Sequence, residues 1–239
     1  MPDMIQVIKS AERYHADHGW LSTWHHFSFN DYFDPNNVNF GPLRVFNDDI
    51  VQPASGFPPH PHRDMEIVTY VLDGELEHQD DQGNRGRILP GEVQVMSAGT
   101  GIVHAERNPS PAAPLHLLQI WVMPRTRGLK PRWEQQRFEP GARLNTLLAV
   151  VTPSDVPPNG PSRLQIDQDA TFFVASLDAG KRLTHSARSG RRAYLFAIAG
   201  ALDVNGASLD TGDQARITEE ADLTLTARAP AELVLIDLP

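Results

Sequence analysis

Two short stretches of the chain each place two potential metal ligands one residue apart. One stretch contains His60 and His62, and the other contains His104 and Glu106. In an extended strand, residues i and i+2 point to the same face, so the two members of each pair can aim at one point. If the two strands face each other, three imidazoles and one carboxylate converge and leave coordination positions free for water or a substrate. This spacing predicts an open metal site.

The chain contains no cysteine among its 239 residues. Thiolate zinc sites, iron–sulfur clusters, blue copper centres and cysteine nucleophiles are therefore excluded, and any metal must be held by nitrogen and oxygen. Three histidines and one glutamate suit Fe(II), although Mn, Co, Ni, Cu or Zn can compete for such a site. We expect one divalent ion, with Fe(II) as the first choice.

Charge and hydropathy restrict the kinds of partner. The formal net charge of -9 at pH 7 repels a phosphate backbone, which disfavours direct nucleic-acid binding. No apolar run approaches the roughly 18 residues of a membrane span, so we expect no membrane insertion. The first nine residues lack the basic and apolar pattern of a signal peptide. These features predict a cytoplasmic protein.

The elements that must position the ligands have the pattern of short β-strands. Between residues 41 and 124, β-branched and alternating runs are separated by turns such as Asp73-Gly74 and Pro90-Gly91. Many short strands at regular spacing are typical of an antiparallel sandwich or barrel. The predicted fold class is therefore all-β.

The second half of the chain repeats this outline without its ligands. Residues 194–206 again form an apolar run, a glycine turn and an alternating run, which indicates an internal repeat of one barrel. Only His185 stands where the first histidine pair would fall, and no histidine follows it. We expect a structural second barrel without a comparable metal site, with His185 exposed or hydrogen-bonded. We place the domains at residues 1–135 and 136–239.

Several motifs together resemble a known family. The glycines at positions 56, 74 and 91, spaced around His60, His62 and His104, resemble the two motifs of the cupin superfamily. Residues 27–35, 60–70 and 98–106 resemble hallmark sequences of the pirin family. This resemblance is strong in the N-terminal half and covers the C-terminal half only in architecture. It implies two tandem jelly-roll-like cupin barrels, iron binding, quercetinase activity in bacterial members and transcriptional co-regulation in animal members.

The resemblance also implies a ligand set, namely His60, His62, His104 and Glu106. Glu66 matches the glutamate of the general cupin motif, but pirins take the carboxylate from the second motif, so we leave Glu66 out of the set. Its even spacing from His62 would allow it inward by strand alternation, but it lies about 13 Å along the strand from His62, at roughly 3.3 Å per residue, too far for both to touch one ion unless the chain bends or bulges. We expect Glu66 to accept a hydrogen bond from a ligand histidine; the alternative is a solvated carboxylate at the rim.

The expected function is a metal-dependent dioxygenase that cleaves a flavonol such as quercetin with O2. Glu106 would act as ligand and as general base. An apolar slot for the flat substrate would draw on Phe46, Phe57, Met65 and Met96, each of which is also an ordinary core residue. Another phenol or enol could be the natural substrate.

The alternative is a non-catalytic regulator whose metal state tunes a surface that docks onto a partner protein. The basic segment 125–132 and the ligand-free second barrel are conceivable docking features. A solvent-open cavity at the metal favours chemistry, whereas a plugged barrel favours docking. The sequence leaves the oligomeric state open.

Overall fold

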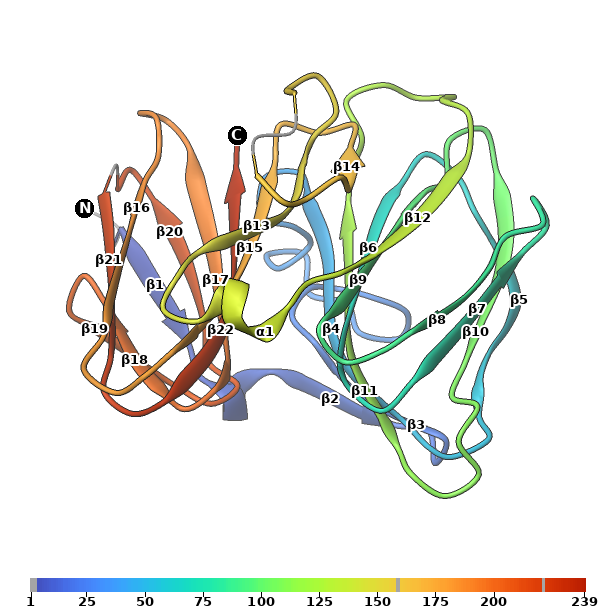
Figure 1. The fold of residues 1–239 in the computed structure, drawn as a ribbon, viewed down its shortest axis with the longest axis horizontal. Coiled ribbons are helices and arrows are strands. Elements are labelled where there is room, and N and C mark those ends of the chain that lie inside the picture. Colours follow the sequence, from blue (N-terminus) through green and yellow to red (C-terminus); the bar gives the residue numbers. More distant parts are fainter. Residues whose placement is uncertain (1–3, 158–159, 221) are drawn as a thin grey trace. The chain divides into compact units, whose positions relative to one another are not determined.

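The computed structural model describes residues 4–157, 160–220 and 222–239, which are built almost wholly from β-strands (Figure 1). The chain divides into two compact units. The first unit comprises residues 14–138 and 164–168, and the second comprises the N-terminal segment up to Arg13 together with 139–163 and 169–239. Among the described residues, no helix is long and apolar enough to cross a membrane.

The first unit consists of two antiparallel sheets. The larger sheet has the order β12-β9-β6-β11-β4-β3-β2 and contains β2 (Tyr14–Asp17), β3 (Leu21–His25), β4 (Leu43–Val51), β6 (Glu66–Asp73), β9 (Glu92–Ser97), β11 (Leu115–Val122) and β12 (Arg132–Arg137). The smaller sheet has the order β5-β10-β7-β8 and contains β5 (Gly56–His62), β7 (Leu76–Asp80), β8 (Arg85–Ile88) and β10 (Ile102–Arg107). The short β14 (Gln165–Ile166) belongs to the segment 164–168.

The second unit repeats this plan. One sheet runs β1-β20-β17-β22-β15-β13, with β1 (Ile5–Ile8), β13 (Leu148–Pro153), β15 (Thr171–Leu177), β17 (Arg192–Ala199), β20 (Gln214–Thr218) and β22 (Ala231–Leu238). The other runs β16-β21-β18-β19, with β16 (Arg182–Ser186), β18 (Ala201–Val204), β19 (Ala207–Asp210) and β21 (Asp222–Ala227). Two short helical turns, η1 (Ser10–Glu12) and α1 (Pro140–Arg143), complete the unit.

From β12 to β3, and from β5 to β8, the strand order of the first unit corresponds to that of the second, which confirms the predicted all-β architecture of two tandem jelly-roll-like units. The sheets face each other as open layers rather than closing into continuous barrels. β1 occupies in the second unit the edge position that β12 occupies in the first. A domain boundary at residue 135 stays a proposal; that residue lies within β12, and the contacts of β1 assign the first residues of the chain to the second unit.

The interiors of the two units differ in polarity. Among the described residues of the second unit, β17, β21 and β22 contribute alanine and leucine to a large apolar cluster. Described apolar clusters of the first unit include one around Ile67 and Met96 and one around Val71 and Leu117. Between these clusters, five strands each direct a polar residue inward. We call this set the polar belt: Asp49, Thr69, Gln94, Glu106 and Gln119.

Candidate metal centre

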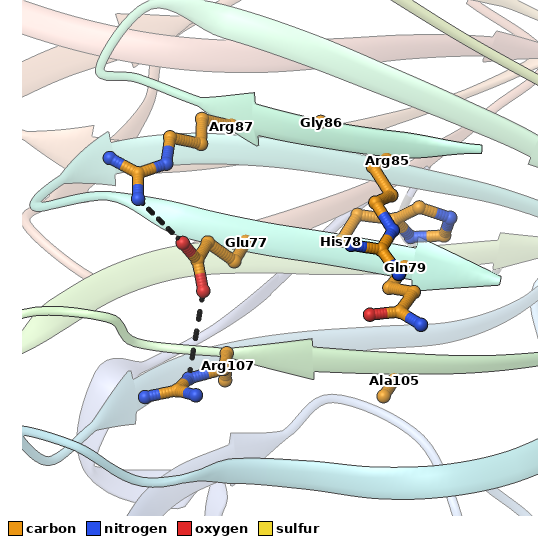
Figure 2. Close-up of a pocket in the computed structure, with 8 residues that line it drawn as sticks. All are labelled: Glu77, His78, Gln79, Arg85, Gly86, Arg87, Ala105 and Arg107. Carbon is orange, nitrogen blue, oxygen red and sulfur yellow. Dashed lines mark hydrogen bonds and ion pairs between the residues drawn. The ribbon is translucent and has the colours of Figure 1, made fainter. Parts of the chain in front are cut away.

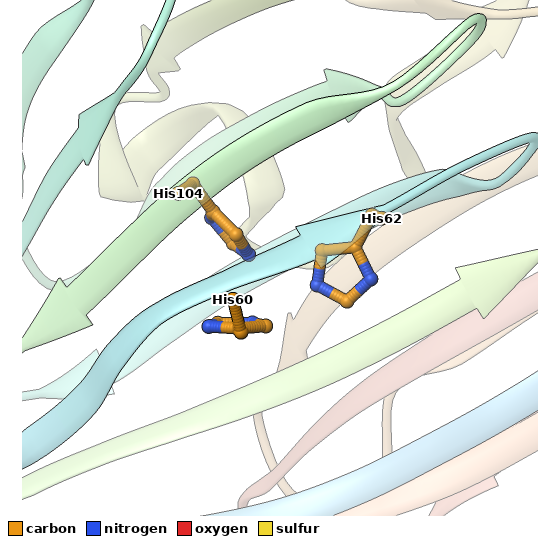
Figure 3. A group of neighbouring side chains, drawn as sticks. All are labelled: His60, His62 and His104. Carbon is orange, nitrogen blue, oxygen red and sulfur yellow. The ribbon is translucent and has the colours of Figure 1, made fainter.

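The first unit brings three of the predicted ligands together. His60 and His62 alternate on β5, and the antiparallel register places His104 of β10 opposite His60. The ring centroids are 4.4 Å apart for His60 and His104, 4.7 Å for His60 and His62, and 4.9 Å for His62 and His104. Figure 3 shows the three rings gathered beside the two strands, and each offers a nitrogen within 4.8 Å of the others.

The state of these rings fits a metal ion. His104 is 2% exposed, and neither of its ring nitrogens has a hydrogen-bond partner. A buried imidazole without partners is costly unless an ion or ligand completes it. His60 Nδ1 lies 2.8 Å from the Pro58 carbonyl oxygen, which can only accept, so Nδ1 carries the proton and Nε2 is free to bind.

Electrostatics keep two of the rings neutral. Burial, together with the neighbouring histidines, lowers the pKa of His62 and of His104 to about 3. A neutral imidazole is the form that binds metal. At neutral pH these two side chains are therefore ready to bind a divalent ion without first losing a proton.

Glu106 lies two residues beyond His104 on β10 and faces the same interior. Its two oxygens accept hydrogen bonds of 2.8 Å from Gln94 Nε2 and Gln119 Nε2. The ligand atoms of Glu106, His104 and His78 lie within 4.8 Å of one another. Those of His60, His62 and His104 form a separate group by the same distance, and Glu106 does not belong to it. The four-residue ligand set thus remains a proposal.

A closed ring of side chains orients the Glu106 carboxylate. Trp133 Nε1, which can only donate, lies 2.7 Å from Gln94 Oε1 and so turns the Gln94 amide nitrogen towards Glu106. Gln94 Nε2 also donates to Thr69 Oγ1 at 3.2 Å, and Thr69 in turn donates to Gln119 Oε1 at 2.9 Å. Sequence reasoning missed this ring. The available signal was a glutamine or threonine at an inward position of an apolar strand.

A cavity of about 440 Å³ opens beside the histidines. Phe57, one of the four predicted slot residues, lies in its wall, and the aromatic residues Phe29 and Trp121 were not predicted. Trp121 stands edge-on to His62, with ring centroids 4.8 Å apart. His60 and His62 are only partly buried, so the cavity can be reached from solvent. The described residues that line it are Phe29, Asn30, Asn47, Asp49, Phe57, His60, Pro61, His62, Ile67, His104, Glu106, Gln119 and Trp121.

The other three predicted slot residues lie elsewhere. Phe46 is fully buried and stacks on His26, because Asn47 and Asp49 take the inward face of β4 and strand alternation sends Phe46 to the other face. Met96 is fully buried beside Ile67, its partner on the neighbouring strand, and Met65 packs against the same apolar cluster. These three residues support the wall without lining it.

The expected role of Glu66 needs correction. Its carboxylate accepts a 2.6 Å hydrogen bond from Ser97 Oγ, and no ligand histidine is among its described partners. Ile67, the next residue, faces the cavity, so Glu66 points to the opposite face of β6. Asp64 has φ +48° and interrupts the extended chain between His62 and Glu66. Strand alternation therefore does not continue from one residue to the other, and their even spacing does not place them on the same face. Glu66 is 2% exposed, so the alternative prediction of a solvated carboxylate at the rim does not hold either.

A buried carboxyl group in the cavity wall was also missed. Burial raises the pKa of Asp49 to about 7, and the nearby carboxylates of Asp48 and Glu106 act in the same direction. Asp49 lies on β4, one of the strands of the polar belt. Near neutral pH it can hold a proton next to the candidate ligands.

A second hollow, of about 460 Å³, lies over the outward faces of β7, β8 and β10 (Figure 2). Glu77 forms ion pairs there with Arg87 at 2.8 Å and Arg107 at 3.7 Å. The arginine side chains are at least 60% exposed. Exposed, mutually paired charges of this kind contribute little energy and are typical of a solvated strand face.

In the second unit, His185 is hydrogen-bonded, one of its two predicted states. Its Nε2 lies 2.9 Å from Asp237 Oδ2. β21, which corresponds to β10, contributes Leu223 and Leu225 to the apolar core where β10 carries His104 and Glu106. The described interior of this unit is apolar at that place.

Comparison with known proteins adds family information. Residues 7–122 match the family model described as Pirin, and residues 156–238 match the model described as Quercetinase C-terminal cupin domain. The chain is 42% identical over 236 residues to a quercetin 2,3-dioxygenase of Escherichia coli (strain K12), with 99% of each chain covered. It is 47% identical over 222 residues to a pirin-like protein of Caulobacter vibrioides, covering 93% of this chain and 94% of that one.

A solved structure shows the same similarity in three dimensions. The bacterial pirin YhhW from Escherichia coli, in complex with nickel(II), is 42% identical to this chain. The two superpose with a TM-score of 0.91, covering 98% of this chain and 99% of that one.

Proposed function

The chain belongs to the pirin family, and from that membership and the geometry of its first unit we infer that it is a metal-dependent dioxygenase that cleaves a flavonol such as quercetin with O2. The observation that carries this proposal is His104, a buried imidazole without partners that faces an open cavity beside His60 and His62. A cavity of about 440 Å³ lies in the range of small-molecule sites, roughly 300–1,000 Å³.

We propose His60, His62, His104 and Glu106 as the residues that hold the ion. The bound metal would supply a Lewis acid that polarises the enol oxygen of the substrate and couples the substrate to O2. The nitrogen and oxygen donors fit Fe(II), which remains our first choice, and the nickel complex of YhhW illustrates that another divalent ion is bound by a similar protein.

The protein side chains position the substrate and its proton. Phe29, Phe57 and Trp121 offer aromatic surfaces against which a flat polyphenol can stack. Glu106, held by its two glutamine partners, would receive the proton of the enol hydroxyl as general base. The hydrogen-bonded ring keeps this carboxylate from rotating while it does so.

The proposal is tested by quercetin turnover and O2 uptake with iron-loaded protein. His62→Ala and Glu106→Ala should each lower kcat by at least about 100-fold, because each removes a ligand or the base. His116→Ala is the matched control, since His116 belongs to the same unit but pairs with Asp48 at 2.6 Å outside the cavity wall. Equal activity in all four proteins would reject the mechanism.

The regulatory alternative has less support from the described residues. The cavity beside the histidines can be reached from solvent, which is what catalysis needs. In the basic segment, two arginines are paired with carboxylates of this chain: Arg125 lies 3.7 Å from Asp167, and Arg132 lies 3.6 Å from Glu134.

A screen of phenols and enols by O2 uptake would show whether quercetin stands in for another substrate. We keep a cytoplasmic location as a proposal from the sequence.

A further inference from the structure

We propose that His78, His104 and Glu106 form a second, inner position for a divalent cation next to the three-histidine site. Their ligand atoms lie within 4.8 Å of one another, and all three residues are at most 2% exposed. His78 comes from β7, the neighbour of β10 on the side away from β5. His104 thus stands between two candidate positions, and each of its two nitrogens is free.

His78 is held as metal-binding histidines usually are. Its Nε2 lies 3.2 Å from Asp80 Oδ2, and its Nδ1 is buried without a hydrogen-bond partner. The Asp80 carboxylate also accepts from Asn84 Nδ2 at 2.8 Å and from the backbone N–H groups of Gln82 and Asn84 at 3.0 and 2.9 Å. Because Asp80 acts as acceptor throughout, His78 Nε2 carries the proton and Nδ1 keeps its lone pair for a metal.

Two further features favour a cation at this place. Glu106 and Asp80 together supply two negative charges against the double charge of the ion, and both are buried. Trp133 stacks on the His78 ring at a centroid distance of 5.1 Å and an interplanar angle of 14°, which fixes the ring plane. The His78 imidazole is thus held by the Asp80 carboxylate through a hydrogen bond and by the Trp133 indole through stacking.

The two positions share His104 and Glu106, so one ion occupies them in turn. Two dications in one buried site would repel each other strongly, and the shared groups cannot serve both fully. The outer position opens into the cavity, whereas His78 is not among the described residues that line this cavity, and all three inner ligands are at most 2% exposed. An ion held by His78 would therefore lie farther from a substrate in the cavity than an ion held by His60 and His62.

The test uses Co2+ alone and the double variant His60→Ala/His62→Ala, which removes the outer ligands. Equilibrium dialysis should still give one Co2+ per chain. Adding His78→Phe, which preserves the stacking on Trp133, should weaken binding by more than the roughly 10–100-fold cost of losing a group that only orients a ligand. Adding His116→Phe, the matched control, should leave binding unchanged.

Binding by the double variant that is unaffected by His78→Phe would overturn the proposal, as would no binding by the double variant at all. Tryptophan fluorescence provides a second measurement in which His78 is left intact. In the double variant, Co2+ quenching should survive Trp121→Phe and disappear in Trp133→Phe, because Trp133 contacts His78 and Trp121 contacts His62. The opposite result would place the ion near Trp121, at the outer position, and would contradict the proposal. No substrate is present, so the outcome is independent of quercetin turnover.

Discussion

At the residue scale, the orientation of one carboxylate depends on a hydrogen bond formed two side chains away. Trp133 determines which end of the Gln94 amide faces Glu106, and Thr69 and Gln119 close the ring on the other side. In a buried site, each member must have its partner, because an unpaired amide or hydroxyl there costs free energy. The ring of Glu106, Gln94, Thr69 and Gln119 is therefore stable only when all of its hydrogen bonds are formed.

Breaking this ring should loosen Glu106. Gln94→Met removes one donor to the carboxylate, and we expect metal affinity to fall by about 10–100-fold, as is usual when a group that orients a ligand is lost. Trp133→Phe keeps an aromatic side chain but removes the indole N–H, which bonds to Gln94 and not to the carboxylate itself. We therefore expect a smaller loss of metal affinity than for Gln94→Met. Isothermal titration with Ni2+ measures both. Gln79→Met, on the outward face of β7, is the control, and a loss as large as that of Gln94→Met would contradict this account.

Glu66 should make the stability of the protein depend on pH. Burial raises its pKa from 4.5 to about 7, against the opposing effects of Ser97 and Arg132. Between pH 4.5 and 7 the folded protein therefore holds a proton that the unfolded chain has released, so the free energy of unfolding falls as the pH rises. Glu66→Gln, neutral at every pH, should lack this loss.

Chemical denaturation in the presence of a chelator measures the effect. Relative to its value at pH 4, the free energy of unfolding of Glu66→Gln should exceed that of the parent chain by roughly 2–4 kcal/mol at pH 8, from about 1.4 kcal/mol for each pKa unit. Parallel pH profiles for the two proteins would show that Glu66 is not the responsible group.

At the scale of elements, a bulge in β5 aligns the ligands. Opposite the single residue Ala105 of β10, β5 carries two residues, Pro58 and Pro59, so that His104 pairs with His60 and Glu106 with Phe57. Prolines suit this place because they have no N–H to leave unpaired, and β5 is an edge strand. The extra residue sets which side chains of β5 meet those of β10.

Gly56 allows the two strands to approach closely just beyond the bulge. A Cβ at this position would lie 2.3 Å from the Glu106 carbonyl oxygen, so Gly56→Ala must push β5 away from β10. We expect a loss of about 1–3 kcal/mol in the free energy of unfolding and a weaker affinity for Ni2+. Gly141→Ala is the control, because its Cβ would meet nothing within 4 Å and alanine favours the helix α1. Equal effects of the two substitutions would exclude the steric cause.

At the scale of the whole molecule, the first strand of the chain belongs to the second unit. β1 pairs along β20, and Ile5 and Val7 pack against the apolar core of that unit. Lys9 adds an ion pair of 2.7 Å with Asp213, whose carboxylate also accepts from the Ser10 N–H. The candidate metal ligands all lie in the first unit.

A charge on the inner face of β1 should therefore separate stability from metal binding. Val7→Asp places a carboxylate against the apolar core and should lower the free energy of unfolding of the second unit by about 2–4 kcal/mol. Gln6→Asp, on the exposed face of the same strand, should change it by less than about 0.5 kcal/mol. Calorimetry and Ni2+ titration would check this. A Val7→Asp protein with unchanged stability, or with lost Ni2+ affinity, would contradict it.

The sequence by itself determined the all-β repeat and the meeting of His60, His62 and His104. Both follow from local rules, because strand alternation and glycine turns operate over a few residues and the histidines fall on alternate positions of two paired strands. Similarity to a known family added the expectation for Glu106. The same local counting failed for Glu66, where Asp64 interrupts the strand.

Only the tertiary structure decided the partners of Glu106, the cavity wall and the place of His78. Gln94, Thr69, Gln119 and Trp133 come from four different strands, and no spacing along the chain records that their side chains meet. Phe46 and Phe57 look alike in sequence, yet alternation and the β5 bulge send one behind the wall and the other into it. A sequence specifies contacts along a strand, whereas contacts across layers depend on which face each strand presents once the sheets have packed.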